Sequence, residues 1–286
     1  MKHASTAYLL PGQGVQSVGM GKDLYDGSPA AKKTFQEIDD SLGRPLSKLL
    51  FSGNESDLMA TINAQPAIMA VSLASFNAVQ ERLGSSGMPD AAYVAGHSLG
   101  EYTALAIAGV LSVRDTAQLV QERGRLMQEA CDNQPGTMAA VLGLDQFTVE
   151  RIARETGTYL SNVNTPQQIV ISGDAVAVSQ ALDLASDMGA KKLIRLQVAG
   201  AFHSALMAPA ESGLSNAINK FTFNDSIIPI VANCTGKPIS SAEDVKAELV
   251  AQIVALQLQT VMLLPRHFGF IFEFVVGLVY RSELRQ

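Results

Sequence analysis

Cysteine is scarce in this chain, which contains only Cys131 and Cys234 among 286 residues. Two cysteines are too few for a disulfide scaffold, and neither stands in a C-x-x-C spacing that would hold a metal. We therefore expect no structural metal site and no bound cofactor. Because reduced cysteines are typical of proteins inside the cell, we also expect a cytoplasmic location.

Basic residues are also few, with 21 lysines and arginines against 27 acidic residues, a net charge of −6 and a pI near 5.2. The chain has no run of basic residues that could neutralise a phosphate backbone. The composition therefore excludes nucleic acid as an expected partner. It is otherwise the composition of an ordinary globular protein, with 47% hydrophobic and 17% charged residues.

Long hydrophobic runs are missing at both ends. The apolar stretch near the N-terminus is interrupted by Pro11 and Gly12, so it lacks the apolar core of a signal peptide. Near the C-terminus, residues 268–280 are rich in Phe, Val and Ile, but this run is short and contains Glu273. Since a spanning helix needs about 20 apolar residues, we expect no membrane partner.

The hydrophobic pattern predicts two kinds of unit. Residues 6–10 and 91–95 are short apolar strands, and helices are expected over 98–110 and 115–130. From Gly136 onward the expected order is strand, helix, two strands, helix and strand, over residues 138–142, 146–155, 159–163, 168–172, 174–188 and 192–198. This βαββαβ order is that of a ferredoxin-like unit. A chain of this length suits one large domain with such an insertion.

A candidate nucleophile lies between the strand 91–95 and the helix that follows it. Gly96-His97-Ser98-Leu99-Gly100 matches the G-x-S-x-G pattern, in which a sharp strand-to-helix turn exposes the serine hydroxyl. The two glycines leave room for this turn, and the start of the helix points free N–H groups at a developing oxyanion. The alternative is a tight turn with a purely structural role.

Serine needs a proton acceptor, and His203 is the best of the four histidines. His3 is terminal, His97 adjoins Ser98 with its side chain aimed away from the hydroxyl, and His267 lies in the unusual C-terminal segment. His203 follows a strand and a corner of small residues. A purely structural histidine at this position is the alternative.

Arg123 is the most informative charged residue. Its neighbours three and four residues away on the expected helix 115–130 are all apolar, whereas those of Arg125 are all polar. Arg125 should therefore face solvent, and Arg123 should lie in the core-facing stripe. A buried guanidinium needs an anion, because it cannot lose its proton. That anion is either a distant Asp or Glu of the protein or a bound carboxylate; alternatively the side chain extends to the surface.

Several motifs in one order resemble the malonyl-CoA:acyl carrier protein transacylase family. They are Pro11-Gly12-Gln13-Gly14-Val15-Gln16, Gly96-His97-Ser98-Leu99-Gly100-Glu101-Tyr102, Arg123-Gly124, Asn162-Val163-Asn164, Gln168-Ile169-Val170-Ile171-Ser172-Gly173 and Gly200-Ala201-Phe202-His203-Ser204. The resemblance covers residues 5 to 255. It implies an α/β fold: an α/β-hydrolase-like large domain with a parallel sheet (residues 1–130 and 199–286) and an inserted ferredoxin-like subdomain (131–198) that covers a cleft.

The resemblance also implies roles for individual residues. Ser98 is the acylated serine and His203 its base, while the backbone amides of Gln13 and Leu99 form the oxyanion hole. Arg123 holds the malonyl carboxylate.

Two more roles follow from the same resemblance. The main-chain carbonyl of Gln252 orients the histidine in place of a triad carboxylate, and Phe202 is similar to the malonyl-selective form of that corner. The expected partners are malonyl-CoA and acyl carrier protein, used in turn by a monomeric enzyme of fatty-acid or polyketide synthesis.

The resemblance ends after Ala255, where an apolar segment rich in Gln and Phe begins. A change of reading frame or a divergent ending would each produce it. Three alternatives to the expected activity stay open: a stand-alone acyltransferase of polyketide synthesis or malonate decarboxylation, a serine esterase, and an inactive remnant. A serine esterase fits least well, since a neutral ester offers nothing to pair with Arg123.

Overall fold

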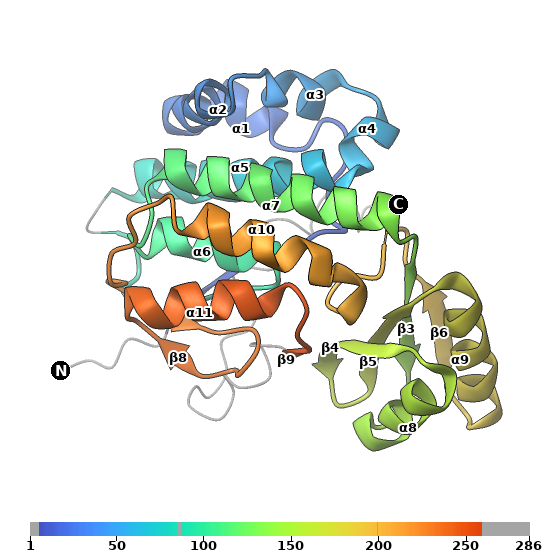
Figure 1. The fold of residues 1–286 in the computed structure, drawn as a ribbon. Helices are drawn as coiled ribbons and strands as arrows, with labels where there is room; N and C mark the ends of the chain where they lie inside the picture. The colour runs from blue at the N-terminus through green and yellow to red at the C-terminus, as the bar shows by residue number, and fades with distance from the viewer. Residues whose placement is uncertain (1–5, 85–86, 199, 259–286) are drawn as a thin grey trace.

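The computed structural model describes residues 6–84, 87–198 and 200–258 (Figure 1). The segment 268–280 and most of the departure after Ala255 lie outside the described residues. No described helix is long and apolar enough to cross a membrane. The described chain forms a larger helix-rich part with one sheet and a smaller part with a second sheet (Figure 1).

The larger sheet consists of β1 (Thr6–Leu10), β2 (Ala91–Gly96), β7 (Ile230–Val231) and β8 (Pro238–Ile239), in the order β1-β2-β7-β8. The first three strands are parallel, and β8 runs antiparallel to β7 at the edge. Strands β1 and β2 lie where the apolar runs predict them. The two-residue strands β7 and β8 are too short for periodicity to reveal.

The helices of the larger part are α1 (Lys22–Gly27), α2 (Pro29–Leu42), α3 (Leu46–Ser52), α4 (Glu55–Met59), α5 (Thr61–Leu83), α6 (Leu99–Ile107), α7 (Val113–Asn133), the 3-10 turn η1 (Ala205–Met207), α10 (Ala208–Ile218) and α11 (Ala242–Gln252). Helix α6 follows β2 directly and packs against both β1 and β2. Helices α2, α5, α7, α10 and α11 pack one against the next (Figure 1).

Helix α7 begins earlier than its expected start at Asp115. Ser112 caps it, because the side chain of Ser112 accepts a hydrogen bond from the backbone N–H of Asp115 at 3.0 Å. The expected start at Asp115 is therefore two residues late, because α7 begins at Val113. A serine is as good a cap as an aspartate, so composition could not decide between them.

The smaller part contains β3 (Thr137–Leu142), α8 (Gln146–Thr156), β4 (Tyr159–Thr165), β5 (Gln168–Gly173), α9 (Ala175–Asp187) and β6 (Lys192–Arg195). Strand order β6-β3-β5-β4, antiparallel throughout, is that of a ferredoxin-like unit. The predicted fold class is confirmed. The domain boundaries at residues 131 and 198 remain a prediction.

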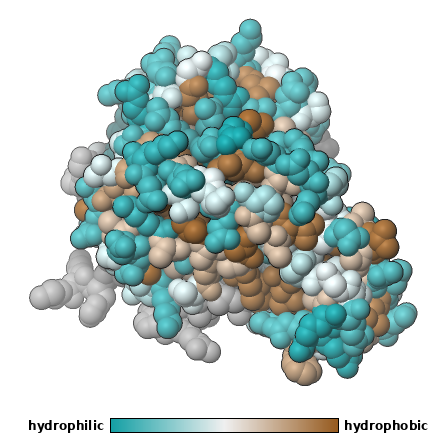
Figure 2. All heavy atoms as spheres, viewed as in Figure 1, coloured by the Kyte–Doolittle hydropathy of each residue, from teal (hydrophilic) through white to brown (hydrophobic). Residues whose placement is uncertain are grey.

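A fifth strand, β9 (Gln257–Leu258), joins the small sheet parallel to β4. It comes from the segment after α11, so the chain returns from the large part to the edge of the small sheet. The two parts have separate buried clusters, one around α5 and α7 and one between the small sheet and α8 and α9. On the face shown in Figure 2, polar residues dominate over α2, and hydrophobic residues gather lower, towards the small sheet.

Candidate active site

Ser98 lies at a strained turn between β2 and α6. Its backbone φ is 50°, in the left-handed region that side chains disfavour. The turn is so tight that a Cβ at Gly96 would come within 1.9 Å of the backbone of Gly100, and a Cβ at Gly100 would come within 2.3 Å of the carbonyl oxygen of Leu10. Both glycines are therefore required by the turn, as the motif predicts.

The base candidate, His203, shares this unusual backbone. Ser98 and His203 are the only non-glycine residues with positive φ in the described part of the chain. Such strain costs of order 1–3 kcal/mol and gathers at functional sites. The Oγ atom of Ser98 lies 2.9 Å from Nε2 of His203, which is hydrogen-bond distance. Residues 105 positions apart are thus brought into a buried contact with the geometry that a nucleophile and its base require.

The main-chain carbonyl of Gln252 accepts a hydrogen bond from Nδ1 of His203 at 2.9 Å. Because a carbonyl can only accept, the proton of the neutral ring resides on Nδ1, and Nε2 is free to accept from Ser98. Burial, followed by the positive charge of Arg123, lowers the pKa of His203 to about 3. The imidazole is therefore neutral at physiological pH and able to take a proton.

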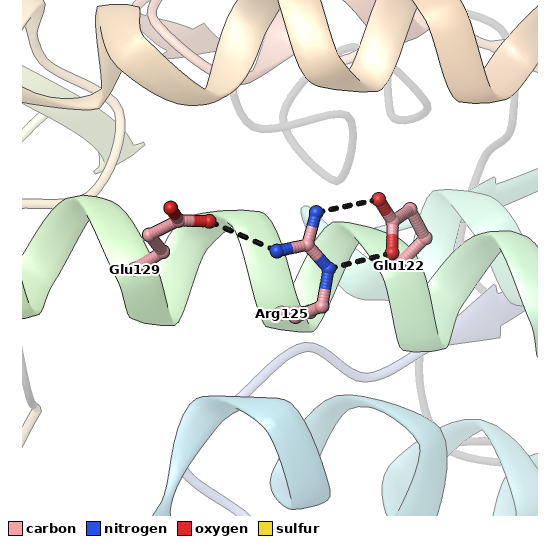
Figure 3. Close-up of polar contacts among 3 residues, drawn as sticks. All are labelled: Glu122, Arg125 and Glu129. Atoms are coloured by element: carbon pink, nitrogen blue, oxygen red, sulfur yellow. Dashed lines mark hydrogen bonds and ion pairs between the residues drawn. The ribbon is translucent and has the colours of Figure 1, made fainter.

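Two arginines on α7 have opposite environments, as their neighbours predict. Arg125 is exposed and forms ion pairs with Glu122 and Glu129 at 2.7 and 2.9 Å (Figure 3). Arg123, two residues earlier, is 1% exposed and lies over the ring of Tyr102. Exposed pairs of the first kind contribute little to stability, whereas a buried guanidinium has to be compensated by its surroundings.

The hydrogen-bond partners of Arg123 are all neutral. Nη1 donates to the side-chain oxygen of Gln65 at 2.6 Å, and Nη2 donates to Oγ of Ser98 at 3.1 Å and to Oε1 of Gln252 at 2.9 Å. Within residues 6–84, 87–198 and 200–258, no carboxylate forms an ion pair with this guanidinium. Of the alternatives for Arg123, the extended surface position and a direct protein ion pair are thus not seen there.

The candidate oxyanion groups belong to the start of α6 and to the loop after β1. Leu99 is the first residue of α6, where backbone N–H groups have no partner within the helix. Gln13 follows β1 in a loop that packs closely on the turn, since a Cβ at Gly12 would come within 2.5 Å of His97. The side chain of Gln13 accepts a hydrogen bond from Thr61 at 2.7 Å, which holds this loop in place.

The side chain of His97 contacts the small sheet. Its Nε2 lies 3.3 Å from the side-chain amide of Asn162 on β4, so the residue bridges the turn to the small sheet. Burial lowers the pKa of His97, and the charge of Arg123 lowers it further. A neutral ring suits this contact with an amide.

Sequence reasoning missed three residues that hold the site together. Asn233 accepts from the backbone N–H of Ser98 and donates to the carbonyl of Gly96, both at 2.7 Å. Gln65 holds Arg123, and Glu101 accepts from Gln252 and from the backbone of Asn233. Only Glu101 stands inside a motif, and Gln65 and Asn233 carry no local signal.

Fold and site together define an acyl-transferring serine enzyme of the α/β class: a nucleophile on a strand–helix turn, a neutral histidine and a buried cation beside them. The comparisons agree, because the acyl transferase domain family matches residues 7–261. The chain belongs to the malonyl-CoA:acyl carrier protein transacylase family of such domains.

Three relatives illustrate how similar this chain is to members of the family. The malonyl CoA-acyl carrier protein transacylase of Bacillus subtilis is 43% identical over 253 residues, covering 86% of this chain and 78% of the relative. The acyl-carrier-protein S-malonyltransferase structure of Bartonella henselae superposes with a TM-score of 0.86 at 39% identity, covering 96% and 91% of the two chains. A malonyl transacylase in complex with the acyl carrier protein of a type II polyketide synthase superposes with a TM-score of 0.85 at 36% identity, covering 91% and 85%.

Proposed function

We propose that this protein transfers the malonyl group from malonyl-CoA to the phosphopantetheine thiol of an acyl carrier protein, through an acyl-Ser98 intermediate. One observation carries the choice of acyl group: Arg123 is buried beside Ser98 with only neutral partners. A carboxylate on the incoming acyl chain would supply the missing negative charge, held by the two ends of the guanidinium. The named relatives act on the same acyl group.

The first half-reaction follows from the geometry. His203 Nε2 takes the proton of the Ser98 hydroxyl as Oγ attacks the thioester carbonyl. The carbonyl oxygen becomes an oxyanion, for which the backbone N–H groups of Gln13 and Leu99 are the proposed donors. The carbon–sulfur bond then breaks, and the coenzyme A thiol leaves with the proton that His203 received.

The second half-reaction runs in reverse with a different thiol. The phosphopantetheine thiol gives its proton to His203 and attacks the malonyl-serine ester, and Ser98 recovers its proton as the malonyl thioester leaves. The Gln252 carbonyl keeps His203 in one tautomer throughout. We propose Phe202, which is buried beside the base, as a residue that favours malonyl over bulkier acyl groups.

Partner, location and assembly are part of the same proposal. An acyl carrier protein is the acceptor, as the complex among the solved relatives suggests for that enzyme. A cytoplasmic location fits two free cysteines. A monomer suffices, because Ser98, His203 and Arg123 all come from one chain. The polyketide and malonate-decarboxylase alternatives share the same acyl-serine chemistry and differ only in the carrier.

Intact-mass spectrometry after mixing with malonyl-CoA or acetyl-CoA tests the proposal. We expect a malonyl adduct on the protein, a much weaker acetyl adduct, and loss of the malonyl adduct when holo acyl carrier protein is added. Loss in buffer at the same rate would instead indicate an esterase. An unlabelled, folded protein would support the inactive alternative.

A further inference from the structure

A buried acidic residue, Glu101, lies beneath the catalytic pair. It stands in the first turn of α6, three residues after Ser98, and is 1% exposed. A negative charge in the first turn stabilises a helix, and an exposed side chain is enough for this effect. Burial of a carboxyl group is costly, so the helix dipole does not account for its position.

The first contact of Glu101 is with Gln252. Oε2 of Glu101 accepts a hydrogen bond from Nε2 of Gln252, which also donates to the carbonyl of Ser98 at 3.1 Å. Oε1 of the same Gln252 amide accepts from Arg123 at 2.9 Å. If the amide turned over, its NH2 group would face the guanidinium, donor against donor. Glu101 and Arg123 therefore fix one orientation of Gln252.

This orientation matters because Gln252 also carries the carbonyl that accepts from His203. The side-chain bonds of Gln252 hold the last turn of α11 against Ser98, and so hold that carbonyl in line with Nδ1 of the ring. Glu101 thereby acts on the base through Gln252.

The second contact of Glu101 acts on the nucleophile. Its Oε1 accepts from the backbone N–H of Asn233 at 3.3 Å. Asn233 in turn accepts from the N–H of Ser98 and donates to the carbonyl of Gly96. One carboxyl group thus supports both the strained turn and the segment that orients the base.

We propose that Glu101 is a positioning residue for acyl transfer, whose two carboxyl oxygens align Ser98 and His203 by holding Asn233 and Gln252. The proposal deepens the proposed function and rests on it for the identity of the nucleophile. Burial and the nearby charge of Glu248 raise the pKa of Glu101, and perturbed acids of this kind gather at functional sites.

The test is Glu101→Gln, with Glu248→Gln as the matched control. Glu101→Gln keeps the size of the side chain but replaces one acceptor oxygen by an NH2 group, which must face the donor of Gln252 or of Asn233. Glu248 is a buried residue of α11 whose hydrogen-bond partner is Cys234, through the backbone N–H at 2.8 Å and through the side chain. No hydrogen bond among the described residues joins Glu248 to Ser98, His203 or Gln252, and its charge acts on Glu101 only by raising the pKa of that carboxyl group.

The readout is the rate of Ser98 labelling by phenylmethanesulfonyl fluoride, a neutral probe that does not need Arg123. We expect Glu101→Gln to slow labelling by about 10- to 100-fold, the size of effect that follows when a buried hydrogen-bond donor is left without its acceptor. With malonyl-CoA, kcat should fall by a similar factor while KM changes little, because Gln65 still holds Arg123. Glu248→Gln should label at the wild-type rate.

A second readout distinguishes a loss of His203 positioning from a general loss of stability. The hydrogen bond to the Gln252 carbonyl raises the pKa of His203, so loosening it should move the acid limb of the labelling profile to lower pH in Glu101→Gln. Wild-type labelling by Glu101→Gln, an unmoved acid limb, or equal losses in both variants would each overturn the proposal. Should Glu101→Gln not fold, Glu101→Asp, which keeps the carboxyl group but shortens the reach to Gln252, is held to the same criteria.

These outcomes are independent of the acyl group. If the wild-type protein reacts with the sulfonyl fluoride but not with malonyl-CoA, the proposed function fails, and the comparison of Glu101→Gln with Glu248→Gln still decides the role of Glu101.

Discussion

Replacing Arg123 by alanine removes the one buried cation beside Ser98 and should change substrate choice. In the folded protein this guanidinium makes hydrogen bonds to Gln65, Gln252 and Ser98, all of them neutral groups. A malonyl carboxylate would hydrogen-bond to it directly, whereas the nearby Glu101 acts on it only through space. Hydrogen bonds to a charged group contribute about 1.5–3 kcal/mol, so kcat/KM for malonyl-CoA should fall by roughly 10- to 150-fold.

Acetyl-CoA should respond differently to the same substitution. Its methyl group gains nothing from a guanidinium, and removing a buried charge lowers the cost of placing an apolar group there. We expect acetyl transfer to change little or to improve, so the ratio of the two kcat/KM values should fall by about the whole malonyl loss.

The assay is steady-state transfer from both thioesters to holo acyl carrier protein, for the wild type, Arg123→Ala and Arg123→Lys. Lysine keeps the charge but loses the planar fork, so its malonyl rate should lie between the other two. A circular dichroism melt controls for unpaired Gln65 and Gln252, which should cost about 1–3 kcal/mol of stability. Equal losses for both thioesters would refute the reasoning and make Arg123 a structural residue.

Four other outcomes are expected. Ser98→Ala should fold and take up no malonyl group, and an adduct on this variant by intact mass would place the nucleophile elsewhere. His203→Ala should slow acylation about 10²–10⁴-fold at neutral pH, measured by single-turnover kinetics. Because the pKa of His203 is lowered to about 3, sulfonyl fluoride labelling of the wild type should keep its full rate well below pH 6.5. With a base of ordinary histidine pKa, the labelling rate would already be halved at about pH 6.5. Gly96→Ala should abolish folding or labelling, since its Cβ would overlap the backbone of Gly100; an active, stable variant would contradict the tight turn.

The sequence by itself determined the features that depend on local geometry. The turn at Ser98 needs small residues two positions before and after it, so glycine marks the turn wherever the rest of the chain lies. The burial of Arg123 follows from helical periodicity, because residues three and four apart share a face. The ferredoxin-like order is likewise visible, since its strands and helices are long enough for their patterns to differ.

Tertiary structure alone decided the contacts that join distant segments. Gln252 supports His203 through a backbone carbonyl, a group that every residue has, so only the family resemblance, and no local pattern, could single it out. Asn233 binds the Ser98 turn across 135 positions, and it lies just after β7, a strand too short to predict. The neutral partners of Arg123 come from α5, α11 and the turn before α6, so only the packed chain brings them together. The positive φ of His203 is likewise a property of the packed chain, because no local pattern marks backbone strain.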